Sequence, residues 1–192
     1  TLIGRWVLYT ACMQNKLWQD SGCKPIYVSV NLSPAQLIQE NFIDMVSEIL
    51  EETELAPEYL ELEITESVAV KNYDYITDKL EKLKKMGIRI ALDDFGTGYS
   101  SLNYLKNFAI TTLKIDRSFI HDINENPKNS AIVSSILAMG RNLKLCITAE
   151  GVETKEQYET LRDRGCDIAQ GFYFSEPLPL HEFEKLMKKL GG

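Results

Sequence analysis

The chain has 192 residues, of which 44% are hydrophobic and 26% are charged, and its formal net charge at pH 7 is -7. This length gives one sizeable core and is too short for two full domains, so we expect a single domain over residues 1–192. The acidic balance argues against general nucleic-acid binding, which needs a cationic surface. It allows an anionic small ligand, because bound metal ions reverse the charge inside a site.

Histidine and cysteine chemistry is not indicated. The two histidines, His121 and His181, lie far apart in the sequence, which argues against a histidine metal site or a catalytic triad. The four cysteines form no Cys-x-x-Cys pair, and Cys146 and Cys166 fall inside predicted buried strands. Free cysteine is usually buried, so reduced core residues are favoured over a disulfide or a zinc site.

No apolar run approaches ~18 residues, so no membrane span is expected in this chain. The N-terminus shows no basic region followed by an apolar stretch, so no signal peptide is expected either. We expect a cytoplasmic domain, and a membrane-anchored parent protein stays open.

Apolar runs alternate with helical patterns along the whole chain. The periodicity predicts, in chain order, a helix over 2–18, a strand over 26–31, a helix over 34–52, a strand over 59–64, a helix over 72–86, strands over 88–92 and 111–115, a helix over 127–141, a strand over 143–149, a helix over 154–164, a strand over 166–174 and a helix over 180–190. Ser33 and Pro34 indicate a helix start, and Gly87 and Gly165 indicate helix ends.

Strands that alternate with helices are typical of a parallel sheet with helical crossovers, which places the chain in the α/β class. A doubly wound open sheet and a (β/α) barrel both fit this pattern. No Gly-rich phosphate loop follows a strand, which weakens the nucleotide-binding open-sheet interpretation.

Every predicted strand ends in polar side chains. In chain order these are Asn31, Glu63, Asp93 with Asp94, Lys114 with Asp116, Glu150, and Gln170. In a barrel the C-terminal ends of parallel strands meet on the face that carries active sites. Carboxylates gathered there need neutralising, and oxygen ligands without histidine favour Mg²⁺ or Mn²⁺.

Each of these residues also has a plainer interpretation. A single acidic residue at a strand end is often a helix cap or a solvated loop residue, and Lys114 is also compatible with a counter-charge that only stabilises the cluster. Six polar strand ends in succession favour a shared site. Residues 94–101, Asp-Phe-Gly-Thr-Gly-Tyr-Ser-Ser, suit a mobile loop over that site, and the alternative is a tight turn into a helix capped by Ser100.

Six segments resemble, in order, the motifs of EAL-domain cyclic di-GMP phosphodiesterases. They are residues 31–33 (NLS), 63–67 (EITES), 93–101 (DDFGTGYSS), 114–119 (KIDRSF), 150–154 (EGVET) and 170–172 (QGF). The resemblance covers essentially the whole chain. It implies a (β/α)8 TIM-like barrel that opens cyclic di-GMP to linear pGpG with two divalent metal ions, Mg²⁺ or Mn²⁺. Two metals close together lower the pKa of water and stabilise both the attacking and the leaving oxygen.

The resemblance also implies a role for each matching residue. The implied metal ligands are Asn31, Glu63, Asp93, Asp94 and Glu150. Asp93 would bridge the metals, and Lys114 would contact and position the attacking water. Gln170 would line the site near the substrate. Glu66 would not bind metal itself but would hold the loop over residues 94–101 in its working position. Asp116 and Glu153 would be supporting residues. The implied catalytic set is Asp93, Lys114 and Glu150.

The Glu-Ala-Leu motif of the family, whose glutamate is a metal ligand, does not appear in this sequence, nor does the nearby arginine that usually contacts the substrate. The family barrel has eight strands and six are predicted here, so the first two strands are expected to lie upstream. A sequence restricted to ordered residues, a shortened chain and a naturally degenerate protein would each explain this. The intact downstream motifs favour the first two explanations.

Three functions fit the sequence. The first is an active phosphodiesterase, the second a cyclic di-GMP receptor without turnover, and the third a protein-interaction module with a relic site. The metal ligands that are present favour the enzyme. The resemblance further implies a homodimer through helices near residues 94–101, and sensory or diguanylate cyclase domains outside this chain.

Overall fold

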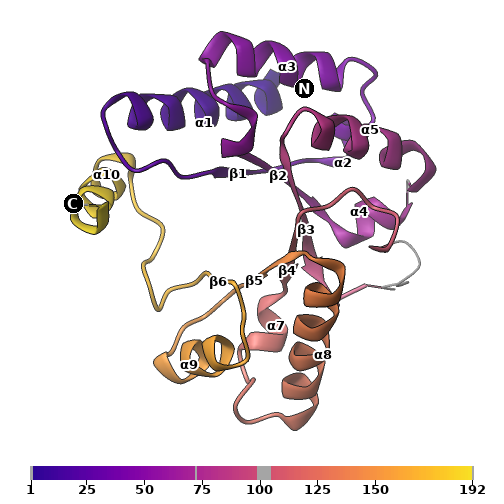
Figure 1. Ribbon diagram of the computed structural model, residues 1–192, viewed down its shortest axis with the longest axis vertical. Helices are drawn as coiled ribbons and strands as arrows, with labels where there is room; N and C mark the ends of the chain where they lie inside the picture. The colour runs from indigo at the N-terminus through magenta and orange to yellow at the C-terminus, as the bar shows by residue number, and fades with distance from the viewer. Residues whose placement is uncertain (1, 72, 99–104, 192) are drawn as a thin grey trace. The chain divides into compact units, whose positions relative to one another are not determined.

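The computed structural model describes residues 2–71, 73–98 and 105–191 (Figure 1). These residues form two compact units. The first unit contains Thr1–Ile64, Asn72–Ile90 and Pro177–Gly192, and the second contains Thr65–Lys71 and Ala91–Glu176. Strands in the described chain follow the sheet order β1-β2-β3-β4-β5-β6, and every described pairing is parallel, which confirms the predicted α/β class.

The first unit places helices beside the start of the sheet. Its elements are α1 (Leu2–Asp20), β1 (Val28–Asn31), α2 (Pro34–Leu37), α3 (Phe42–Thr53), a 3-10 turn (Pro57–Tyr59), β2 (Leu60–Thr65), α5 (Tyr73–Lys85) and α10 (Leu180–Gly191). The buried Asn15 amide of α1 donates to the carbonyls of Ile26 and Tyr59, at 3.0 and 3.1 Å. One side chain therefore fixes α1 against the segments that lead into β1 and β2.

The predicted helix over 34–52 is two helices in the structure. Ser33 caps α2 as expected, but α2 ends at Leu37 and α3 begins at Phe42. The buried Lys79 ammonium donates to the carbonyls of Leu37 and Gln39. Because these carbonyls bond to a residue far along the chain, the backbone between α2 and α3 does not continue the helix. Periodicity within the segment could not reveal that contact.

The second unit carries the later strands. Its elements are α4 (Glu66–Lys71), most of β3 (Arg89–Phe95), β4 (Thr112–Ile115), α7 (Arg117–Ile120), α8 (Pro127–Leu143), β5 (Cys146–Ala149), α9 (Lys155–Asp163) and β6 (Ile168–Ala169). Within the described residues, no helix is long and apolar enough to cross a membrane.

Two strand predictions in this unit are wrong in extent. The strand expected over 166–174 is only two residues long, because the backbone then turns and the Phe174 amide donates to the Gly171 carbonyl at 3.1 Å. Phe172, Tyr173 and Phe174 are exposed. The strand expected from residue 143 begins at Cys146, after α8 continues to Leu143. Cys146, at the start of β5, and Cys166, outside β6, are half-buried rather than core residues.

All four thiols are free. Burial raises the pKa of Cys12 to about 12 and that of Cys166 to about 11, which keeps both thiols protonated at neutral pH.

Gly140 lets α8 pack directly on β5. A Cβ at this position would lie 2.1 Å from Cδ1 and 2.6 Å from Cγ1 of Ile147. A Gly-to-Ala change inside an exposed helix normally stabilises it by about 1 kcal/mol. We expect Gly140→Ala instead to destabilise the fold by about 1–3 kcal/mol through overpacking, measured by chemical denaturation.

The double variant Gly140→Ala/Ile147→Ala supplies the control. Its loss of unfolding free energy should be smaller than the sum of the losses of the two single variants, because Ile147→Ala removes the side chain with which the new methyl group clashes. Additive losses would contradict this packing account.

Candidate active site

Three carboxylates converge in the second unit. Asp93, Asp94 and Glu150 each offer an oxygen, and these oxygens lie within 4.8 Å of one another. Asp93 and Asp94 belong to β3, and Glu150 directly follows β5. Three negative charges in so small a volume need cations or protons beside them. Oxygen-only donors in this arrangement fit a hard divalent cation such as Mg²⁺ or Mn²⁺.

A β-bulge explains how two successive residues reach the same centre. Side chains alternate between the faces of a regular strand, so neighbours should point apart. The β3–β4 register pairs Leu92 with Leu113 but Phe95 with Ile115, which leaves one extra residue in β3. Asp94 takes a left-handed conformation, with φ of 55°. A bulge of this kind re-aims a side chain next to a site.

Lys114 lies between two of the carboxylates. Its Nζ is 2.6 Å from Glu150 Oε1 and 3.2 Å from Asp93 Oδ1. The Lys114 side chain is only 6% exposed, so its charge is stable there only with such partners. The pairing also offsets part of the repulsion between the carboxylates.

The environment of Asp94 perturbs its pKa. Burial, and then the negative charges of Asp93 and Asp116, raise the pKa of Asp94 above its ordinary value, while Lys114 acts in the opposite direction. Ionisation of Asp94 is therefore less favourable than that of a solvated carboxyl group, and added positive charge would favour it.

A cavity of about 510 Å³ opens onto this cluster. It is lined by Asp94, Asp116, Arg117, Glu150, Gly151, Glu153, Gln170, Gly171 and Phe172. Four of these lining residues are acidic, and Arg117 is basic. An anionic ligand would enter this cavity only with cations present, which is the same requirement that the clustered carboxylates impose.

Two glycines let the cavity loops touch. A Cβ at Gly151 would lie 2.5 Å from Cβ of Arg117, and Gly151 has a positive φ of 69°. A Cβ at Gly171 would lie 2.2 Å from the carbonyl oxygen of Val152. Larger residues would therefore push apart the loops that follow β4, β5 and β6.

Glu66 contacts the segment after β3. Its Oε2 accepts the amide of Gly96 at 3.0 Å, and a Cβ at Gly98 would lie 2.9 Å from Oε1. The start of the predicted loop over 94–101 is thus held by Glu66. Residues 99–101 and the proposed cap Ser100 lie outside the described residues.

The remaining predicted site residues occupy defined places. Asp116 caps α7 by accepting the Ser118 amide at 3.0 Å, so the plainer cap interpretation also applies to it. Asn31 and Glu63 belong to the first unit, where they lie side by side as register partners of β1 and β2. Asn31 is exposed and Glu63 is buried.

Sequence reasoning missed several residues around these positions. Arg117 and Phe172 line the cavity. Arg117 directly follows Asp116, and Phe172 lies two residues after Gln170, which was the available signal. Glu61 is buried in the first unit and accepts from Ser29 and Arg89, at 2.9 and 3.3 Å. Nothing in the local sequence distinguishes Glu61 from a solvated strand residue.

Comparison with known proteins identifies the same family that the sequence motifs resemble. The EAL domain family model matches residues 1–177. The chain is 46% identical to the bifunctional diguanylate cyclase/cyclic di-GMP phosphodiesterase MucR of Pseudomonas aeruginosa, over 94% of this chain and 26% of that protein. It is 44% identical to the signaling protein YkoW of Bacillus subtilis, over 96% of this chain and 23% of that protein. The chain thus spans about a quarter of these curated relatives.

A solved structure of the MucR phosphodiesterase in complex with c-di-GMP matches with a TM-score of 0.91 and 46% identity, over 95% of this chain and 74% of that one. Such similarity establishes the TIM-barrel-like α/β fold that the sequence predicts.

The raised pKa of Asp94 predicts how stability depends on pH when divalent metal is chelated. The cost of ionising Asp94 in the fold is absent below its ordinary pKa and grows as pH rises through the raised value. We expect Asp94→Asn to gain stability over the wild type as pH rises from acidic to neutral, measured by denaturant unfolding.

Asn also suits the left-handed backbone at this position, but that gain does not depend on pH. If the stability difference between Asp94→Asn and the wild type stayed constant from acidic to neutral pH, it would contradict the raised pKa of Asp94.

Proposed function

Because the chain belongs to the EAL domain family, we propose that it is a metal-dependent phosphodiesterase that hydrolyses cyclic di-GMP to linear pGpG. The observation that carries the proposal is the convergence of Asp93, Asp94 and Glu150 around the Lys114 ammonium, beside an open cavity. A family match alone does not fix chemistry, whereas this group of residues suits phosphodiester hydrolysis.

The proposed metal site takes two divalent ions, Mg²⁺ or Mn²⁺. Asn31, Glu63, Asp93, Asp94 and Glu150 would hold the ions, and Asp93 would serve both. All five side chains offer oxygen, which hard cations prefer. When bound, such ions would supply positive charge for the phosphate and lower the pKa of an attacking water.

The protein's own residues then orient the reaction. Lys114 holds the attacking water in line with the phosphorus, and its pairing with Asp93 and Glu150 fixes the ammonium. The water oxygen forms a bond to phosphorus, the bond from phosphorus to the 3′ oxygen breaks, and a proton passes from the water to that oxygen. Gln170 lines the cavity where the nucleotide would lie.

Three further residues support this arrangement in the proposal. Glu66 holds the loop over residues 94–101 through Gly96. Asp116 fixes the turn after β4, and Glu153 lines the cavity beside Glu150.

The proposal also covers the extent of the domain, its cellular location and its partners. We take residues 1–192 as one domain, because the family match continues through both units. The domain would act in the cytoplasm and form a homodimer through helices near residues 94–101. The proposal places sensory or diguanylate cyclase domains outside this chain, and the longer relative MucR is named a bifunctional diguanylate cyclase/cyclic di-GMP phosphodiesterase.

The direct test is incubation of the chain with cyclic di-GMP and Mg²⁺ or Mn²⁺, followed by chromatography. We expect pGpG to form and EDTA to stop its formation. Binding of cyclic di-GMP without product would favour a receptor over an enzyme. The absence of both binding and product would contradict the proposal.

Removal of a proposed ligand should abolish turnover. We expect Asp93→Ala or Glu150→Ala to lower the rate of pGpG formation by at least about 100-fold, because even residues behind the ligands contribute 10–100-fold. Asp163→Ala, which removes an exposed carboxylate paired with Arg162, is the matched control and should keep the rate. Near-normal turnover by either folded ligand variant would sink the metal assignment.

A further inference from the structure

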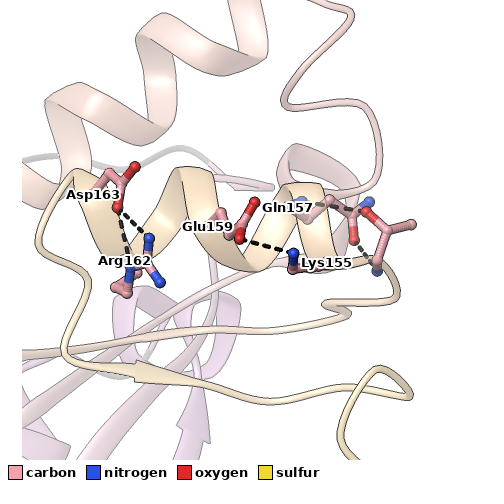
Figure 2. Close-up of polar contacts among 6 residues, drawn as sticks. Lys155, Gln157, Glu159, Arg162 and Asp163 are labelled. Carbon is pink, nitrogen blue, oxygen red and sulfur yellow. Dashed lines mark hydrogen bonds and ion pairs between the residues drawn. The ribbon is translucent and has the colours of Figure 1, made fainter.

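Gln157 is a buried polar residue that the proposed reaction does not use. It lies in the first turn of α9 and is 6% exposed (Figure 2). The ion pairs Lys155–Glu159 and Arg162–Asp163 on the same helix are exposed to solvent. Exposed pairs of that kind contribute roughly 0–1 kcal/mol. A buried amide needs specific partners, and Gln157 has them.

The Gln157 amide uses both of its ends. Its Oε1 accepts the backbone N–H groups of Glu153 and Thr154, at 2.7 and 3.0 Å. Its Nε2 donates to the carbonyl of His121 at 2.9 Å. Acceptance from Thr154 belongs to an ordinary capping box, in which Glu serves as well as Gln. Donation to His121 requires an amide, because a carboxylate would face the carbonyl oxygen with no proton between them.

The two backbone segments that Gln157 joins both lead into the candidate site. Glu153 and Thr154 end the loop over residues 150–154, which begins at Glu150. His121 ends α7, which follows the β4 residues that include Lys114. The same two segments touch a second time, where Gly151 packs on Arg117. Gln157 is therefore placed to fix the spacing between the loop that begins at Glu150 and helix α7, which follows the strand that carries Lys114.

The opposite side of the loop over 150–154 is already fixed. Buried Val152 donates to the carbonyl of Gln170 at 3.0 Å and accepts from the Tyr173 amide at 3.0 Å. That contact ties the loop to the segment after β6. Without Gln157 the loop would keep this tie, and the Glu150 amide would keep its hydrogen bond to the Ile115 carbonyl at 3.1 Å. The rest of the loop would lose its hydrogen-bonded link to α7, which would leave the Glu150 side chain less constrained relative to Lys114.

We propose that Gln157 is a positioning residue for the candidate site, which sets the placement of Glu150 by linking the loop over 150–154 to the end of α7. The inference rests on the proposed function for its consequence in metal binding. It goes beyond that function because Gln157 touches none of the reacting groups. Misplacing a ligand by about 1 Å is enough to cost on the order of 100-fold in activity.

Two variants distinguish the acceptor and the donor of the Gln157 side-chain amide. Gln157→Met removes both, and Gln157→Glu keeps the acceptor for Glu153 and Thr154 but loses the donor to His121. Thr160→Ala is the control, since Thr160 lies on the same helix and bonds Asn124 in the segment after α7 at 2.7 Å, away from the loop. The readouts are hydrogen exchange of the Glu153 and Thr154 amides, and Mn²⁺ affinity well below the melting temperature.

We expect Gln157→Met to speed exchange at both amides and to weaken Mn²⁺ binding, each by about tenfold. Gln157→Glu should keep the amides protected and still weaken Mn²⁺ binding. Thr160→Ala should leave both readouts within about twofold of the wild type. A merely stabilising role would lower the melting temperature of Gln157→Met and leave Mn²⁺ affinity unchanged, and that result would overturn the inference.

Wild-type Mn²⁺ affinity in Gln157→Glu would also overturn it, because the link to His121 would then have no effect on the site. If the wild-type chain binds no Mn²⁺, the proposed function fails. The exchange rates of Gln157→Met then decide by themselves whether Gln157 fixes the loop.

Discussion

The repulsion among Asp93, Asp94 and Glu150 is the constraint on which the rest of the site depends. Their oxygens gather within 4.8 Å, which is unfavourable without compensating charge. Lys114 supplies one positive charge, while burial and the charges of Asp93 and Asp116 raise the pKa of Asp94. The fold thus holds three carboxylates close together, and bound divalent cations would reduce the repulsion between them. This need for positive charge links the architecture of the second unit to its proposed chemistry.

Keeping such a centre together requires rigid connections between loops. A bulge in β3 turns two adjacent aspartates the same way, and Gly151 and Gly171 allow backbone segments to approach where no Cβ would fit. Gln157 adds a hydrogen-bonded link across α7 and the loop over 150–154. Unlike Lys114, which pairs directly with Asp93 and Glu150, these connections carry no charge, so they do not compete with ligands for the carboxylates.

The sequence predicts the repeating units well, because apolar periodicity reports which face of an element is buried. The helix start at Ser33 and the helix end at Gly87 follow from local chemistry and are confirmed. Features that depend on distant partners could not be read in this way. The break between α2 and α3 depends on Lys79, and the roles of Glu61 and Gln157 depend on contacts far along the chain. Likewise, the roles of the predicted metal ligands stay predictions.

Anomalous X-ray diffraction from crystals soaked in Mn²⁺ would test the central claim most directly. The account predicts anomalous peaks within coordination distance of Asp93, Asp94 and Glu150, with the Lys114 ammonium displaced from at least one carboxylate or held beside the ion. Density maps without a peak at these carboxylates, in crystals that bind Mn²⁺ elsewhere or not at all, would contradict it.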